Sequence, residues 1–198
     1  MADKRLTYSD REDAGRRLAA ELVQRDFDAP IVFALPRGGV PVAAKVAEAL
    51  GAPLDLILVR KIGAPFNPEV ALAAIVEGDP PERVVNEEVM RRSGASQEYL
   101  ERETERQREE MQRRRERYLG THNRAEAKGK TAIVVDDGLA TGATMKAAMI
   151  ALRRFGAKKV VVAVPVAPAS EVPELCLIAD EVICLFADSQ FRGVGGAY

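Results

Sequence analysis

Short apolar runs alternate along the chain with stretches in which apolar residues recur at helical spacing. Five continuous apolar runs suit buried strands of a parallel sheet: residues 30–35, 54–59, 131–135, 159–166 and 181–186. Helical spacing is found over three stretches: about 10–25, 40–50 and 145–155. Because strands and helices follow one another repeatedly, the pattern predicts an α/β fold, an open parallel sheet flanked by helices on both faces.

Local signals predict where several of these elements begin and end. Ser9 and Glu12 have the spacing of a capping box, which would make Ser9 the N-cap of the first helix. Gly51 and Gly156 are expected to end the second and third helices. Residues 62–68 contain glycine, asparagine and two prolines, so we expect a loop there.

Three shorter segments are less regular. The apolar residues 70–76 fit either a short strand or a helix, and residues 83–85 fit a short strand. The glycine-rich residues 192–198 fit a loop.

A long polar stretch from Ser96 to about residue 119 is predicted to be an inserted helix within a single domain of residues 1–198. It consists mostly of Arg and Glu, many of them four residues apart, which supports a solvated helix through ion pairs. Pairing with a partner helix in a dimer is the alternative. Nucleic-acid binding is a weaker interpretation, because the acids nearly balance the bases. His122 follows in a polar turn and is expected to be exposed.

Composition narrows the class of protein. The chain has 198 residues, of which 47% are hydrophobic, and its net charge of −1 gives no overall basic field for nucleic acid. The N-terminus lacks the apolar segment of a signal peptide, and no apolar run is long enough to span a bilayer. Cys176 and Cys184 lack CxxC spacing and lie among apolar residues, so we expect two buried thiols in a reducing cytoplasm.

The segment from Ile133 to Thr144 combines the features of a phosphate site. Its strand would deliver two adjacent carboxylates, Asp136 and Asp137, to the carboxyl end of the sheet, where open α/β folds bind ligands. The small residues that follow let backbone N–H groups close around an anion, and the N-terminus of the next helix adds partial positive charge. Thr141 and Thr144 add hydroxyl donors. No Gly-Lys-Ser/Thr follows, so this is not an NTPase P-loop.

The two acids indicate what accompanies the phosphate. Carboxylates would repel a phosphate unless another group needs them. Ribose hydroxyls suit carboxylate acceptors, and Mg²⁺ is a compatible second candidate for Asp136 and Asp137. The plain alternative is a strand-to-helix turn with Asp as the N-cap, which does not account for the coincidence of two acids, two threonines and small residues.

This segment resembles the signature for 5-phosphoribosyl-1-pyrophosphate (PRPP) in type I phosphoribosyltransferases: an apolar strand, two acids, and a loop that ends in Thr-Gly and a further Thr. The order of elements from about residue 30 to about 166 is similar too. The resemblance implies that Asp136 and Asp137 bind the ribose hydroxyls, are catalytic, and lie near Mg²⁺ bound with PRPP. It also implies that the 5-phosphate is held by Gly138, Leu139, Ala140, Thr141, Gly142, Ala143 and Thr144.

Two further segments resemble parts of that family's site. Arg37, Gly38 and Gly39 resemble the pyrophosphate loop, where glycine permits close backbone approach and Arg37 can pair with phosphate, although a mere tight turn is the alternative. Arg60 and Lys61 resemble a basic pair that binds pyrophosphate in some members, with Lys61 a candidate catalytic residue. A surface basic pair is equally common. The predicted loop that follows stands where the family has its flexible catalytic loop, but it carries no His.

The acceptor base stays open. Ala140 stands where members that act on 6-oxopurines carry Asp, which favours an adenine-type enzyme. Pro-Arg-Gly-Gly-Val-Pro instead resembles xanthine–guanine types, and the charged helix resembles an uncharacterised bacterial branch. The base site should lie near Val166 and Phe186. Phe186, Phe191 or Tyr198 could stack on a ring, with a packing role as the alternative for Phe186.

The function implied by the resemblance is transfer of 5-phosphoribosyl from PRPP to a nitrogenous base, a purine or a pyrimidine, in nucleotide salvage, with release of pyrophosphate. The implied partners are PRPP and a small-molecule base, and the implied assembly is a homodimer. A regulator that senses PRPP without transferring it is the alternative, and so is transfer to an amine that is not a nucleobase. A structural protein would not need two acids beside a phosphate loop.

Overall fold

The computed structural model describes residues 7–120 and 124–198, and these form two compact units. The first unit joins the described part of Met1–Leu56 to Ala125–Tyr198, and the second unit is Ile57–Arg124. The charged helix therefore belongs to an inserted unit that is larger than the helix alone. The organisation of the chain as a single domain stays a prediction.

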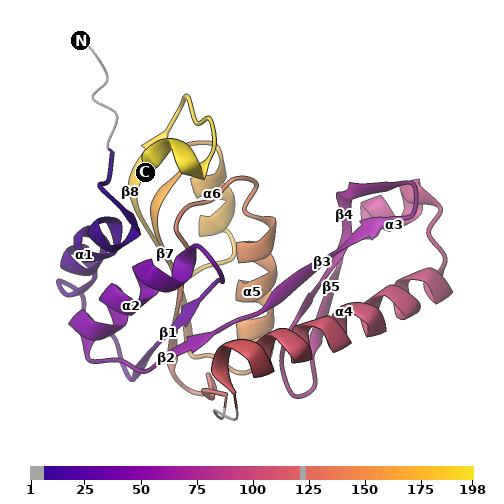
Figure 1. Cartoon of the computed structure of the whole chain (residues 1–198), viewed down its shortest axis with the longest axis horizontal. Helices are drawn as coiled ribbons and strands as arrows, with labels where there is room; N and C mark the ends of the chain where they lie inside the picture. The colour runs from indigo at the N-terminus through magenta and orange to yellow at the C-terminus, as the bar shows by residue number, and fades with distance from the viewer. Residues whose placement is uncertain (1–6, 121–123) are drawn as a thin grey trace. The chain divides into compact units, whose positions relative to one another are not determined.

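The first unit is built on a five-stranded parallel sheet. Its strands are, in sheet order, β2 (Leu54–Leu56), β1 (Pro30–Ala34), β6 (Thr131–Val135), β7 (Lys159–Pro168) and β8 (Glu181–Asp188). α1 (Arg11–Leu22) and α2 (Gly39–Leu50) lie on one side of it, and α5 (Ala143–Arg154) and α6 (Glu171–Cys176) lie on the other (Figure 1). A short 3₁₀ helix, η1 (Val194–Ala197), lies where we expected a loop. The arrangement confirms the predicted α/β fold.

Burial explains why these strands read as continuous apolar runs. All five residues of β6 and four of the five in β1 are buried, as are eight consecutive residues of β7. Helices cover both faces of a parallel sheet, so successive side chains have no solvated face to point to. β-Branched valines dominate these strands because they fit a pleated, buried surface.

α1 begins one residue later than the capping-box pattern predicted. Its N-cap is Asp10, whose side chain accepts a hydrogen bond from the backbone N–H of Asp13 at 2.7 Å. The carboxylate of Asp13 accepts from the N–H of Ser9 at 3.2 Å, so Asp13 takes the part expected of Glu12. The prediction of Ser9 as N-cap is wrong because Asp10 and Asp13 offer the same spacing, shifted by one residue. The helix also ends earlier than expected, at Leu22.

This capping geometry separates the effects of two neighbouring substitutions. Asp10→Ala should lower the free energy of unfolding by about 1 kcal/mol, because a backbone N–H in the first turn loses its partner. For a chain of this size, that corresponds to a fall in Tm of about 2–4 °C. Ser9→Ala should change Tm much less, because only its backbone N–H takes part. Thermal unfolding followed by circular dichroism measures both, and equal losses would contradict the assignment of Asp10.

The second unit contains a three-stranded antiparallel sheet, in the order β3 (Val59–Ala64), β4 (Asn67–Val76) and β5 (Glu82–Val85), with α3 (Glu87–Ser93) and α4 (Gln97–Leu119). Of the two possibilities for residues 70–76, the strand is correct. The short strand expected at residues 83–85 is confirmed as β5. α3 was not predicted.

Two predictions about this region are wrong. Residues 62–68 are not a loop: they form the end of β3, a turn at 65–66 and the start of β4. Their glycine and prolines fit a hairpin whose register shifts around Gly63. In addition, the strand expected at 54–59 ends at Leu56, so Arg60 and Lys61 lie inside β3 instead of closing that strand.

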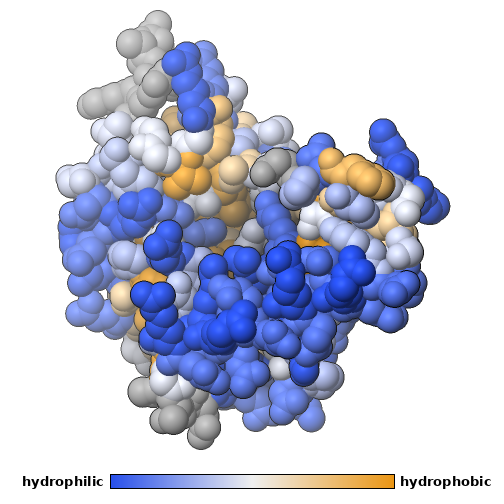
Figure 2. Space-filling model, turned by 45° about the vertical axis from the view of Figure 1, so that its right-hand side comes forward, coloured by the Kyte–Doolittle hydropathy of each residue, from blue (hydrophilic) through white to orange (hydrophobic). Residues whose placement is uncertain are grey.

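The long helix expected from Ser96 to about residue 119 is confirmed as α4, with Ser96 as its N-cap. Three of its residues are buried: Leu100, Gln107 and Met111. Near its end, Arg115 reaches the buried carboxylate of Glu77 with a distance of 2.7 Å between Nη1 and Oε1. Its remaining surface is mostly Arg and Glu, several of them in ion pairs three or four residues apart, and Figure 2 shows a hydrophilic surface over this helix. These contacts agree with a solvated helix supported by ion pairs.

The two cysteines differ in burial. The prediction of two buried thiols is wrong: Cys176 at the end of α6 is exposed, and Cys184 in β8 is only half-buried. Cys176 is exposed because α6 is short and buries only Leu175. His122 lies outside the described residues. Within the parts of the chain that the structure describes, no helix has the length and apolar character needed to cross a membrane.

Candidate functional site

β1 and β6 lie side by side in the sheet, and the chain leaves them in opposite directions. β1 leads through α2 to β2 on one side, and β6 leads through α5 to β7 on the other (Figure 1). The loops after the two strands, residues 35–38 and 136–142, therefore begin side by side and lead to helices on opposite faces of the sheet. Open α/β sheets bind ligands at such a switch point.

Two adjacent carboxylates stand at the carboxyl end of β6. The side chain of Asp136 accepts a hydrogen bond from the backbone N–H of Asp137 at 2.8 Å. Burial raises the pKa of Asp136 above its usual value, and the neighbouring carboxylate of Asp137 raises it further. The side chain of Asp137 is only 13% exposed, and its Oδ2 accepts hydrogen bonds from Arg11. The arrangement offers acceptors to a cation or to hydroxyl donors.

The loop after β1 packs directly against this pair. A Cβ on Gly38 would lie 2.3 Å from Oδ2 of Asp137, and a Cβ on Gly39 would lie 2.7 Å from the carbonyl oxygen of Val135. A side chain at Gly38 would displace the carboxylate of Asp137, and a side chain at Gly39 would displace the backbone of β6, so both positions favour glycine. The exposed Arg37 precedes them. The structure thus brings the segment expected at pyrophosphate together with the two acids.

The segment expected to hold the 5-phosphate, residues 138–144, is tightly packed at its beginning. A Cβ on Gly138 would lie 2.8 Å from Cγ1 of Val166, and the N–H of Leu139 donates to the carbonyl of Val166 at 3.1 Å. At its other end, Ala143 and Thr144 form the half-buried first turn of α5. Both ends of the segment are therefore held by the sheet and the helix.

The middle of this segment is open. Ala140 and Thr141 are exposed, and Gly142, the N-cap of α5, has a φ of 64°, which favours glycine. Backbone N–H groups at the start of a 12-residue helix stabilise an anion. One acid, Glu171, lies near Gly142, and it forms an ion pair with Lys146 at 3.3 Å. This pairing offsets the negative charge beside the segment.

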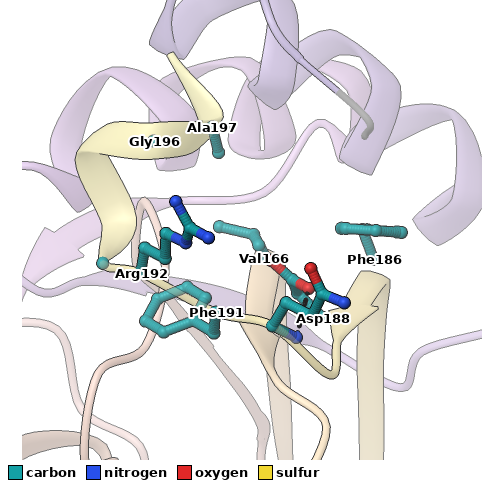
Figure 3. A pocket seen from close by; sticks show the side chains of 9 residues that line it. Val166, Phe186, Asp188, Phe191, Arg192, Gly196 and Ala197 are labelled. Atoms are coloured by element: carbon teal, nitrogen blue, oxygen red, sulfur yellow. Dashed lines mark hydrogen bonds between the residues drawn. The ribbon is translucent and has the colours of Figure 1, made fainter. Parts of the chain in front are cut away.

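A pocket lies at the ends of β7 and β8 (Figure 3). The three residues expected at the base, Val166, Phe186 and Phe191, all line it, together with Asp188 and Arg192. Phe186 and Phe191 also pack against a buried cluster that includes Val166, so each of them both packs against the core and lines the pocket. The pocket has a volume of about 40 Å³, which holds only a few water molecules. A ring therefore enters only if the lining moves.

Arg60 and Lys61 belong to the second unit. The Nε of Arg60 donates to Oε1 of Gln107 in α4 at 2.9 Å, and burial lowers the pKa of this guanidinium. Lys61 is exposed in β3. Their role at pyrophosphate stays a prediction.

Sequence reasoning missed Arg11, Asp188 and Arg192, and it assigned Tyr198 a different role. Arg11 binds the carboxylate of Asp137 from a position 126 residues away, and as one of several charged residues at the start of α1 it carries no distinguishing signal. Tyr198, expected as a stacking residue, donates its hydroxyl to the backbone carbonyl of Asp137 at 2.6 Å. Asp188 and Arg192 also lack a sequence signal, because they become pocket residues only when the chain after β8 folds back.

Comparison with known sequences gives a consistent result. A family model described as "Phosphoribosyl transferase domain" matches residues 6–184. "Putative phosphoribosyl transferase Rv0571c" of Mycobacterium tuberculosis (strain ATCC 25618 / H37Rv) is 46% identical over 191 residues, which cover 96% of this chain and 43% of that protein. The chain thus spans less than half the length of the curated relatives it matches.

Solved structures agree with the result of the sequence comparison. The crystal structure of TT1426 from Thermus thermophilus is 46% identical, has a TM-score of 0.85, and matches over 97% of this chain and 90% of that one. A hypoxanthine phosphoribosyltransferase from Staphylococcus aureus shares the fold at 11% identity and a TM-score of 0.50, over 92% of this chain and 76% of its own. With a family model over most of its length and relatives that are nearly half identical, the chain belongs to the phosphoribosyl transferase domain family.

Proposed function

We propose that this chain binds PRPP with Mg²⁺ and transfers its 5-phosphoribosyl group to a nitrogenous base, releasing pyrophosphate. The observation that carries the proposal is the Asp136–Asp137 pair, which stands between the glycine loop after β1 and the open segment before α5. Acceptors for hydroxyls thus lie beside backbone donors for an anion, and PRPP presents both chemistries.

Each part of PRPP has a counterpart in the first unit. The segment from Gly138 to Thr144 would hold the 5-phosphate, and Asp136 and Asp137 would accept the ribose hydroxyls. The loop of Arg37, Gly38 and Gly39 would meet the pyrophosphate, since glycine lets the backbone approach closely. The assignment of Arg60 and Lys61 to the pyrophosphate stays a prediction.

The residues present fit Mg²⁺ that arrives with PRPP. Among the described residues, no group of three or more His, Cys, Asp or Glu side chains could hold a metal ion by itself. Mg²⁺ commonly binds through one or two carboxylates together with substrate phosphates, which suits the adjacent Asp136 and Asp137. When bound, the ion would supply positive charge that offsets the charge of the departing pyrophosphate.

The proposed reaction forms a bond between a nitrogen of the base and C1 of the ribose. The bond from C1 to the pyrophosphate oxygen breaks, pyrophosphate leaves with the electron pair, and the proton of the attacking nitrogen is released to solvent. Positive charge develops on the ribose ring in between, so the carboxylates of Asp136 and Asp137 would stabilise it. The contribution of the protein is then mainly positioning and electrostatics.

The base is proposed to bind in the pocket at Val166, Phe186 and Phe191. Asp188 and Arg192 add an acceptor and a donor at its wall. Because the pocket is small, the segment that contains η1 would have to shift to admit a ring, since Gly196 and Ala197 line the pocket. The size of the pocket therefore does not identify the acceptor, and the homodimer and the cytoplasmic location stay predictions.

Incubation with PRPP, Mg²⁺ and a panel of purine and pyrimidine bases should release pyrophosphate with at least one base. Calorimetry with PRPP and Mg²⁺ alone measures binding separately. Release with one base identifies both the activity and the acceptor. If PRPP binds but no base in the panel releases pyrophosphate, the result would favour the PRPP-sensing regulator or an acceptor amine of another class. Failure to bind PRPP would contradict both functions.

A further inference from the structure

The carboxylate of Asp137 is held by a residue from the opposite end of the first unit's sequence. Nε and Nη2 of Arg11 lie 2.8 Å and 2.7 Å from Oδ2 of Asp137. Both contacts go to the same oxygen, so Arg11 engages Oδ2 and not Oδ1. Gly38 packs against the same carboxylate. The side chain is therefore enclosed between a guanidinium and a glycine backbone, which restricts its rotation.

An aromatic pair supports Arg11. The guanidinium carbon of Arg11 lies 4.8 Å from the ring centre of Tyr198, within the range of a cation–π contact. The hydroxyl of Tyr198 donates to the backbone carbonyl of Asp137. Tyr198 in turn packs against Tyr8, with 5.7 Å between the ring centres, and the hydroxyl of Tyr8 donates to the carbonyl of Pro165 in β7 at 2.9 Å. Both the side chain and the backbone of Asp137 are thus anchored.

We propose that Arg11 and Tyr198 are positioning residues that orient Asp137 for the ribose hydroxyls, an inference that rests on the proposed binding of PRPP. Asp136 and Asp137 are adjacent acids that repel each other. The ion pair with Arg11 fixes Oδ2 in place, which leaves Oδ1 to accept from the ligand. Arg11 stays on Oδ2 in the complex and touches no reacting atom.

α1 offers a matched control. Arg17 forms an ion pair with Asp13 at 2.9 Å, and its guanidinium carbon lies 5.3 Å from the ring centre of Tyr8. The side chain of Arg17 is 46% exposed, and that of Arg11 is 43% exposed. The two arginines therefore make the same kinds of contact at similar exposure, but only Arg11 reaches Asp137.

The test is the affinity for PRPP, measured by calorimetry in the presence of Mg²⁺. Arg11→Ala should weaken binding roughly 3- to 10-fold, less than for a fully buried charge pair because the guanidinium is partly solvated. Arg11→Lys should recover part of the loss, and Tyr198→Phe should weaken binding by a smaller factor, because its ring still supports Arg11. Arg17→Ala should bind PRPP like the wild type. Thermal unfolding of each variant shows that the fold is retained.

A double-mutant cycle separates positioning from a general structural effect. In an Asp137→Asn background, Arg11→Ala should have almost no further effect on PRPP affinity, because both changes disrupt one unit. Three results would overturn the inference and leave the proposed function intact. The losses of PRPP affinity could be additive in the double mutant, or Arg11→Ala and Arg17→Ala could lose the same affinity. The third result is an Arg11→Ala variant that binds PRPP like the wild type. A wild-type chain that does not bind PRPP would instead show that the proposed function is wrong, and the inference would fall with it.

Discussion

Asp137→Asn should weaken the binding of PRPP with Mg²⁺ by roughly 10- to 100-fold, because a hydrogen bond to a charged acceptor contributes about 1.5–3 kcal/mol and each 1.4 kcal/mol is a factor of ten. Asparagine has nearly the same shape, so its contact with Gly38 remains possible. The partner Arg11 is partly exposed and can be solvated when the negative charge is removed. We therefore expect a loss of binding with a nearly unchanged Tm.

The measurement has two parts. Calorimetry gives the affinity for PRPP, and pyrophosphate release with the accepted base gives the turnover, which should fall by at least the same factor. Asp28→Asn is a suitable control, because Asp28 forms an ion pair with Lys158 at 2.6 Å and is exposed. It should leave both quantities unchanged. An Asp137→Asn variant with wild-type affinity and turnover would show that the ribose is not bound by this carboxylate.

The fold and the centre of the candidate site could be predicted because their signals are local. The valine-rich run at 131–135 must be buried on both faces, and the acids and small residues follow it without interruption. The neighbouring strand and its Gly38–Gly39 turn carry an equally local signal. A parallel sheet places the carboxyl ends of its strands along one edge, so adjacent loops meet there whatever the rest of the chain does.

The residues around these loops could not be predicted, for a physical reason. Arg11 reaches Asp137 only because α1 packs beside the sheet, and neither helix periodicity nor charge distinguishes it from Arg16 or Arg17. Tyr198 likewise depends on how the chain folds back after β8. Such contacts are set by tertiary packing, which a one-dimensional pattern does not contain.

Misleading local signals account for the hairpin error. Glycine and proline usually mark loops, yet around Gly63 they permit close approach within a hairpin: a Cβ there would lie 2.5 Å from the carbonyl oxygen of Pro68. The same physical cause, a backbone that passes too close for a side chain, explains Gly38 and Gly39.

Gly39→Ala should lower Tm by about 2–12 °C, because overpacking costs about 1–3 kcal/mol and each kcal/mol corresponds to about 2–4 °C in a chain of this size. The new Cβ would lie 2.7 Å from the carbonyl oxygen of Val135 and 2.8 Å from the Cα of Asp136. Both are backbone atoms of β6 and its end, so the clash displaces the acids themselves. PRPP affinity should fall by at least roughly tenfold, as when a charged hydrogen bond is lost.

Gly38→Ala provides the contrast, because its new Cβ would meet the side chain of Asp137, 2.3 Å from Oδ2, instead of the backbone. Displacing a side chain costs less than displacing the backbone of a buried strand, so we expect a loss of PRPP affinity with a smaller fall in Tm than for Gly39→Ala. Gly195→Ala is the control, since nothing lies within 4 Å of its Cβ position. Thermal unfolding measures the Tm of the three variants, and calorimetry measures their affinity for PRPP. A Gly38→Ala variant that keeps its PRPP affinity would show that the close packing of this loop on Asp137 is not needed for binding.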